Sequence, residues 1–145
     1  MTDQTSTVAN TTNTRTVEAF LFALRDQDFA TADALLADDL VYENVGLPTI
    51  RGRARVMKMM RAMEGRMGFD VKFHRNVGDG TTVLNERTDA MVFGPLRLQF
   101  WVCGVFEVHD GRITLWRDYF DTLDIVKAML RGIAGIAVPS LRPSF

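Results

Sequence analysis

The chain has 145 residues, of which 47% are hydrophobic and 24% are charged, and its formal net charge is -1. This length and composition are typical of one folded domain, and they exclude a disordered chain, which would have low hydrophobicity and a high net charge. The near-neutral charge also argues against nucleic acid as a partner, because no basic field would attract phosphates.

Cysteine usage and hydropathy narrow the class further. Cys103 is the only cysteine, which excludes an internal disulfide and a structural zinc site built on cysteines. The polar N-terminus lacks the apolar segment of a secretion signal, and no apolar run is long enough for a transmembrane helix. We therefore expect a cytoplasmic protein without a membrane-spanning segment.

The first elements in chain order are expected to be helices. Residues 1–14 are polar and aperiodic, which predicts a disordered tail followed by a single domain over residues 15–145. Apolar residues at helical spacing predict a helix around residues 17–24 and a second, short helix over residues 29–36, with Asp28 as its N-cap. A short extended segment at residues 41–45 precedes a third amphipathic helix at residues 53–64.

Four strands joined by turns are predicted next. Alternation begins at residues 69–74, and longer runs cover residues 81–93, 96–108 and 112–120, separated by Gly-rich hairpin signals. A last helix is predicted from Thr122 to Leu130, with Asp121 as its cap and glycines weakening the pattern beyond it. This order favours an α+β fold in which helices cover the concave face of a curved sheet and enclose a pocket.

The last predicted strand carries an unusual aspartate. Asp118 shares its face with Trp116 and Phe120, and a carboxylate in such surroundings has to be hydrogen-bonded, paired or protonated. Periodicity alone leaves open an exposed aspartate on a mixed strand.

The two histidines, His74 and His109, lie beside no carboxylate motif suited to a metal, so no metal site is expected.

Two other extended segments place polar residues together on one face. Asn85, Arg87 and Asp89 share a face of the strand over residues 81–93, and Tyr42 and Asn44 share a face of the segment at residues 41–45. The pattern does not say which face points inward. A solvated ladder of opposite charges and an ordinary edge strand therefore remain open as alternatives.

Four segments resemble the limonene-1,2-epoxide hydrolase family: YENVGLP (42–48), ERTDAM (86–91), VCGVFEVHDGRI (102–113) and LWRDYFD (115–121). The likeness covers about residues 15–125 in the same order and is strongest toward the mycobacterial epoxide hydrolases of that family. It implies a cone-shaped α+β fold with a curved mixed sheet, similar to nuclear transport factor 2 and ketosteroid isomerase. It also implies a homodimer that uses no cofactor.

The resemblance implies roles for the polar residues singled out above. Asp118 would be the general base, Asp89 the general acid, and Arg87 the bridge between them, while Tyr42 and Asn44 would hold the attacking water. The resemblance also places eight residues in the pocket wall: Met63, Met67, Phe69, Met91, Phe100, Val102, Trp116 and Phe120.

The chemistry of an epoxide suits this set. Ring opening needs a carboxylate that deprotonates water and a carboxylic acid that protonates the departing oxygen. An arginine can donate to both carboxylates at once. When the two carboxyl groups share one proton, the single negative charge that remains balances the guanidinium, and the site has no net charge. The Phe- and Met-rich wall indicates a bulky lipophilic epoxide, such as a terpene, lipid or sterol derivative, which would be converted to a vicinal diol.

Two alternatives remain on the same fold. A ketosteroid isomerase-like enzyme would use a tyrosine and a protonated aspartate to stabilise an enolate, although the cation of Arg87 beside the base counts against it. A non-catalytic lipid-binding module is the second alternative, because a fold does not determine a function.

The apolar residues between 133 and 141 are expected to close the pocket or to pack at a dimer interface.

Overall fold

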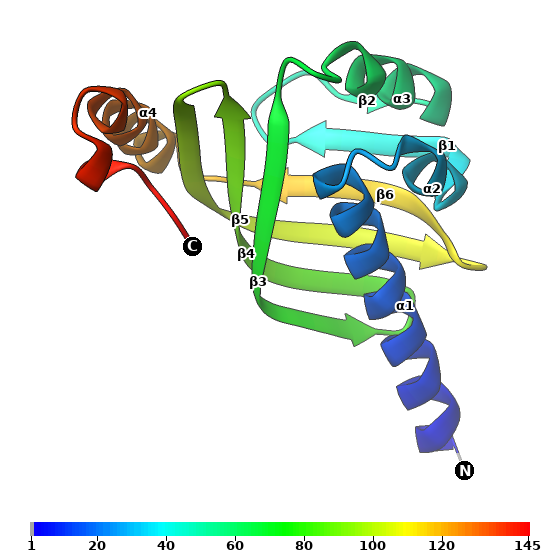
Figure 1. Cartoon of the computed structure of the whole chain (residues 1–145). Coiled ribbons are helices and arrows are strands. Elements are labelled where there is room, and N and C mark those ends of the chain that lie inside the picture. The colour runs from blue at the N-terminus through cyan, green and yellow to red at the C-terminus, as the bar shows by residue number, and fades with distance from the viewer. Residues whose placement is uncertain (1) are drawn as a thin grey trace.

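The computed structural model describes residues 2–145, with side chains from residue 11 onward (Figure 1). Its helices are α1 (Thr2–Arg25), α2 (Phe29–Ala34), α3 (Arg53–Ala62) and α4 (Thr122–Ala137), followed by a single 3-10 turn, η1 (Pro139–Leu141). Its strands are β1 (Leu36–Asn44), β2 (Ile50–Arg51), β3 (Gly68–Asp79), β4 (Thr82–Phe93), β5 (Leu96–His109) and β6 (Arg112–Tyr119).

The six strands form one mixed sheet in the order β2-β1-β6-β5-β4-β3. Strands β3 to β6 form the predicted antiparallel meander, whereas β1 returns to lie parallel to β6. An extra residue at the shift between Phe73 and Arg75 interrupts the regular pairing of β3 with β4, and such bulges bend and twist a strand. The expected fold class, an α+β fold with a curved mixed sheet, is confirmed.

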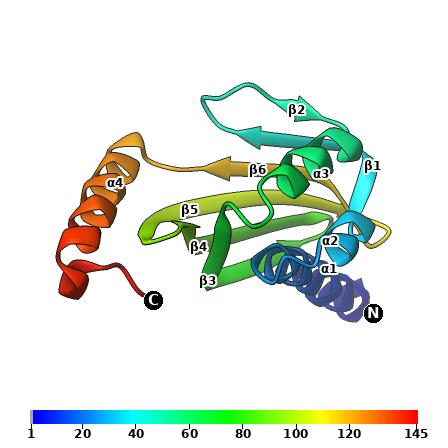
Figure 2. The same cartoon turned by 45° about the horizontal axis from the view of Figure 1, so that its top comes forward.

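Helices α1, α2 and α3 pack against one face of this sheet and share a single core with it, while α4 stands apart from them (Figure 2). Val17, Phe20 and Leu21 supply the buried stripe of α1, and the ring of Phe20 meets Trp116 of β6 edge-on at 5.0 Å. The inner face of the sheet and these three helices therefore form the frame that surrounds the site.

The first helix corrects the expectation for residues 1–14. Helix α1 begins at Thr2, so residues 2–14 are helical and not a disordered tail; Met1 lies outside the described residues. The polar side of the helix is attached to the β3–β4 hairpin. Asn13 donates to the carbonyl of Gly80 and Asn76 donates to the carbonyl of Thr14, both at 3.1 Å. These contacts hold the helix at Asn13 and Thr14 against the hairpin, in a part that shows no apolar stripe.

The remaining elements follow the sequence closely, with differences in the strands β1, β2 and β3. Asp28 and Asp121 cap α2 and α4 as predicted. Asp28 accepts a hydrogen bond from the N–H of Thr31, and Asp121 accepts from those of Leu123 and Asp124. Strand β1 takes up residues 36–40, part of which had been expected as helix, and the two-residue strand β2 was not predicted. Strand β3 continues to Asp79, well beyond residues 69–74.

Helix α4 is longer than predicted. Its glycines do not end the helix but lie where it packs closely against other segments. A side chain at Gly132 would lie 2.8 Å from the carbonyl oxygen of Arg97 and 2.9 Å from Leu98, so the missing side chain lets α4 approach β5. Gly135 gives the same room to the backbone of Arg142. None of the helices among the described residues is long and apolar enough to cross a membrane.

Replacing Gly132 by valine should therefore force α4 away from β5. Overpacking of this kind costs about 1–3 kcal/mol, so the free energy of unfolding should fall by that amount in a denaturant titration. Lys127→Arg is the matched control, because Lys127 is an exposed residue of the same helix. Equal unfolding midpoints for the two variants would contradict the tight contact at Gly132.

Candidate active site

A cavity of about 430 Å³ lies between the inner face of the sheet and the helices, and its wall is mostly apolar. All eight residues expected in the pocket wall line it: Met63, Met67, Phe69, Met91, Phe100, Val102, Trp116 and Phe120. The sequence did not assign nine further lining residues: Leu24, Gln27, Phe29, Leu47, Met59, Met60, Leu98, Ile125 and Ala128. Several of these belong to the apolar stripes of predicted helices. Such a stripe is equally compatible with a packed core and with the wall of a cavity.

Strand β5 determines which face of β4 points inward. The inner side chains of β5 are apolar and buried, and residues directly opposite each other on paired strands share a face. Arg87 lies opposite Val102, and Asp89 lies opposite Phe100. The polar row of β4 therefore points into the core. Arg87 is fully buried and Asp89 is 5% exposed, which contradicts the alternative of a solvated charge ladder.

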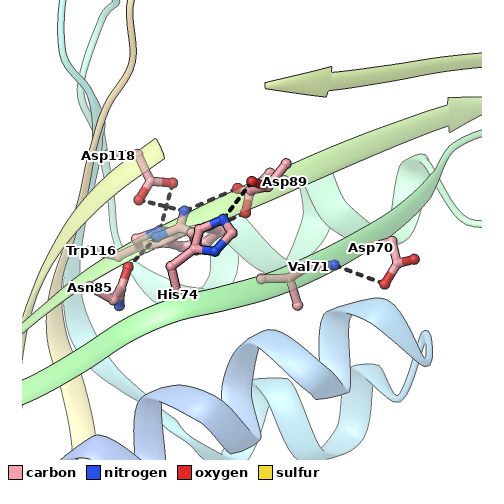
Figure 3. Close-up of polar contacts among 9 residues, drawn as sticks. Asp70, Val71, His74, Asn85, Asp89, Trp116 and Asp118 are labelled. Atoms are coloured by element: carbon pink, nitrogen blue, oxygen red, sulfur yellow. Dashed lines mark hydrogen bonds and ion pairs between the residues drawn. The ribbon is translucent and has the colours of Figure 1, made fainter. Parts of the chain in front are cut away.

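The guanidinium of Arg87 joins β4 to β6 through Asp89 and Asp118, the two carboxylates labelled in Figure 3. Its Nε and Nη2 atoms donate to the two carboxylate oxygens of Asp89, at 2.8 and 3.1 Å. Nη2 also forms an ion pair at 2.7 Å with Oδ1 of Asp118 on β6, and Nη1 donates to Oδ1 of Asn85 at 2.7 Å. The ring of Phe106 lies 5.9 Å from the centre of the guanidinium. The cation is thus held on several sides without contact with solvent.

Asp118 connects this pair to the polar residues of β1. It is 5% exposed, and its Oδ2 accepts a hydrogen bond of 3.0 Å from the indole N–H of Trp116. Because β1 runs parallel to β6, Asn44 lies directly beside Asp118 and Tyr42 lies beside Trp116. The amide of Asn44 donates to the hydroxyl oxygen of Tyr42 at 2.8 Å. The phenolic proton of Tyr42 is therefore left to donate elsewhere.

Burial shapes the acid–base properties of these groups. It raises the pKa of the Asp89 carboxyl to about 6, although Arg87 acts in the opposite direction. It also raises the pKa of Asp118, against the effects of Arg87 and of the Trp116 hydrogen bond. Burial alone would lower the pKa of Arg87, but the two carboxylates outweigh it and keep the guanidinium charged. Burial raises the pKa of Tyr42 to about 12, so its hydroxyl is neutral.

The five residues that the resemblance singled out are therefore brought together. Asp118, Asp89, Tyr42 and Asn44 line the cavity, whereas Arg87 lies behind its surface and links the two aspartates. Two residues without a predicted role, Asn85 and Gly104, lie against the guanidinium of Arg87. The hairpin register could have revealed them, because it places Asn85 opposite Gly104 beside this arginine.

The histidines lie outside this cluster. The Nε2 atom of His74 is 2.8 Å from the hydroxyl of Thr88, and its ring stacks on Trp101 at 4.5 Å. Thr88 and Trp101 belong to the opposite face of the sheet, and neither lines the cavity. Over the described residues, no group of three or more His, Cys, Asp or Glu side chains is arranged to hold a metal ion.

Comparison with known proteins identifies the family of the chain. A family model described as the limonene-1,2-epoxide hydrolase catalytic domain matches residues 11–131. The epoxide hydrolase EphG of Mycobacterium tuberculosis is 64% identical over 126 residues, which cover 87% of this chain and 85% of that protein. A solved structure of an M. tuberculosis LEH-like epoxide hydrolase is 60% identical, with a TM-score of 0.92 over 94% of this chain and 97% of the other.

More distant structures share the fold alone. An NTF2-like protein of unknown function from Burkholderia pseudomallei superimposes with a TM-score of 0.70 at 17% identity, covering 81% of this chain and 97% of the other. It shows that the helix-covered curved sheet is an NTF2-like architecture, as the resemblance implied. With a family model that spans most of the sequence and a relative at 64% identity, the chain belongs to the limonene-1,2-epoxide hydrolase family.

Proposed function

We propose that this protein is an epoxide hydrolase that adds water to a lipophilic epoxide and releases a vicinal diol, without a cofactor. The observation that carries the proposal is the buried Asp89–Arg87–Asp118 cluster at the wall of an apolar cavity. Of two carboxyl groups bound to one cation, one can act as the general acid and the other as the general base. One-step opening of an epoxide requires both.

The neighbours of each carboxyl group support the division of roles. Asp118 lies beside Asn44 on the adjoining strand, and the Tyr42 hydroxyl is close by. A water held by these donors and acceptors would give its proton to Asp118, so we assign the base to Asp118. Asp89 reaches the cavity on the other side of Arg87, and it would protonate the oxygen of the opening ring.

The charge of the cluster supports one shared proton. Two ionised carboxylates and one guanidinium would leave a net negative charge in a site that excludes water. One proton on the pair makes the cluster neutral, and burial favours that state by raising the pKa of both acids. The proton belongs to the pair, because the two groups interact through the same cation.

The cavity supports a lipophilic substrate. Its volume of about 430 Å³ falls within the range of pockets that hold small organic ligands, roughly 300–1,000 Å³. Methionines from α3, from the loop after it and from β4 form much of the wall, and their flexible side chains adapt to irregular apolar shapes. We therefore propose a bulky terpene-, lipid- or sterol-like epoxide as the substrate class.

A homodimer is also part of the proposal, and the surface of α4 supports it. One side of this helix contributes Ile125 and Ala128 to the cavity. Its outer side exposes a patch of apolar residues, in which Leu123, Leu130 and Ile133 are each more than half exposed. Exposed apolar patches on a folded protein commonly mark an interface with another chain.

The proposed activity predicts diols from a panel of epoxides. Bulky apolar epoxides should be converted with a higher kcat/KM than small polar ones, as measured by chromatography of the diol. Asp118→Asn should lower kcat by about 10²–10⁴-fold because it removes the base, while the fluorescence of Trp116 still reports ligand binding. Asp79→Asn is the control, since Asp79 is exposed on a hairpin. Turnover that survives Asp118→Asn would rule out the assigned base.

The pKa of Asp89 predicts the pH dependence. The acid must be protonated to act, and its pKa of about 6 lies above the usual 3.8, so the protonated form is lost as the pH rises through about 6. The kcat/KM profile of the free enzyme should therefore fall above that pH. The kcat profile should extend to higher pH, because a bound apolar substrate excludes water and favours the neutral acid further. A kcat/KM that rises to a plateau above pH 7 would contradict this protonation scheme.

Sedimentation equilibrium tests the homodimer. The unaltered chain should have twice the mass of one chain, and Leu130→Glu should shift it toward the monomer, because a charge in an apolar interface is costly to bury. Asp124→Asn on the same helix adds no charge and should leave the mass unchanged. A single-chain mass for the unaltered protein would end this part of the proposal.

A further inference from the structure

The buried cation of Arg87 has a third polar partner, beside the two aspartates, that takes no part in the proposed chemistry. Nη1 of Arg87 donates to Oδ1 of Asn85 at 2.7 Å, and Asn85 is 5% exposed. Asn85 does not line the cavity, so it does not meet a bound substrate. Its contact instead holds the side of the guanidinium that faces away from Asp89.

Gly104 provides the room in which the guanidinium lies. It is paired with Asn85 of β4 on one side and with Asp118 of β6 on the other, in the row that Arg87 must cross to reach Asp118. A Cβ atom built at Gly104 would lie 2.6 Å from Oδ1 of Asn85 and 2.9 Å from the ring of Phe106, and it would collide with Nη1 of Arg87. Any side chain at this position would therefore occupy the place of the cation.

We propose that Asn85 and Gly104 are positioning residues that fix the plane of the Arg87 guanidinium, so that it contacts Asp89 and Asp118 together. The inference rests on the proposed function of that cluster. Three points define the plane: the two-pronged contact with Asp89, the ion pair with Asp118 and the amide oxygen of Asn85. Without the third point, the guanidinium could turn about its bond to either carboxylate.

The chemistry of the asparagine fits this role. Arginine offers only donors, so the amide oxygen of Asn85 has to face it. The amide nitrogen of Asn85 is buried and has no hydrogen-bond partner among the described residues, which costs stability. The side chain is therefore a poor choice for stability alone. A neutral acceptor also adds no third negative charge to a cluster that one proton makes neutral.

Few titratable groups act on this arginine. Among the described residues they are Asp89 on its own strand, Asp118 on β6 and Tyr42 on β1, while β5 contributes the ring of Phe106. From α1, Glu18 accepts a hydrogen bond from Asn76, the residue opposite Asn85 on β3. A guanidinium that turns away from Asp89 would stabilise its ionised form less. The alkaline limb of the pH profile would then move to higher pH.

Asn85→Leu keeps a similar volume and removes the acceptor, and it should lower kcat by about 10²-fold through misplacement of Arg87. The KM should stay within a few-fold of the unaltered protein, and the alkaline limb of the kcat/KM profile should move upward. Asn85→Ser retains an acceptor oxygen and should recover part of the lost kcat. Gly104→Ala should reproduce the loss and the shifted limb, because its Cβ displaces the same cation.

Thr88→Val is the matched control, since Thr88 is a buried polar residue of the same strand on the opposite face. It should leave kcat and the pH profile unchanged. The Nε–H signal of Arg87 in nitrogen-15 NMR provides a readout without turnover: it should shift in Asn85→Leu and Gly104→Ala and stay in place in Thr88→Val.

Two results would overturn the assignment of Asn85 and Gly104. One is an Asn85→Leu enzyme with the kcat and Arg87 signal of the unaltered protein. The other is a loss of kcat with an unmoved pH limb and an unmoved Arg87 signal, which would indicate general destabilisation. Absence of diol from the unaltered protein would instead overturn the proposed function, while the NMR signal would still test the positioning.

Discussion

The structure depends on the burial of one guanidinium. Arg87 has no exposed surface, and a charge in that position is tolerated only when ionic partners and hydrogen bonds replace its water. Asp89, Asp118 and Asn85 supply those partners from two strands, and Gly104 on the strand between them leaves the space. The carboxyl group of Asp89 is buried as well, and its own burial raises its pKa to about 6 against the opposing effect of Arg87.

The fold connects this constraint to the cavity. A meander alone would bring Asp89 and Asp118 to one face of the sheet, but the parallel return of β1 beside β6 adds the polar pair of Tyr42 and Asn44. Helices α1, α2 and α3 then close the same face with apolar side chains, which leaves these polar groups at the wall of an otherwise apolar cavity. In the proposed function, the substrate and the acid–base groups would share one low-dielectric space.

Much of this arrangement could be predicted from the sequence, for identifiable reasons. The alternation of β5 is one-sided, and the short turn at Gly94-Pro95 fixes its register against β4, so the inward direction of Arg87 follows from the two together. When the faces of each strand are considered separately, that direction stays open. The motifs of the family resemblance, not periodicity, selected the five polar residues.

Other features could not be read from the sequence, because they depend on tertiary contacts. The helical start at Thr2 lacks an apolar stripe, and the extension of α4 past Gly132 requires knowing that β5 lies against it. The volume of the cavity depends on how the methionine side chains pack, which the sequence does not give. The hydrogen bond between Asn85 and Arg87 joins residues that are two apart on the same strand. That spacing is equally compatible with two side chains that do not contact each other.

In the proposed mechanism, the carboxylates act on water and never form a bond to the substrate. A single turnover in water enriched in oxygen-18, with enzyme in excess over epoxide, distinguishes this mechanism from one with a covalent intermediate. One-step hydrolysis predicts one heavy oxygen in the first diol released and none in the carboxyl groups of Asp89 or Asp118. An unlabelled first diol would mean that an enzyme carboxylate supplied the oxygen through a covalent ester, and it would rule out one-step hydrolysis.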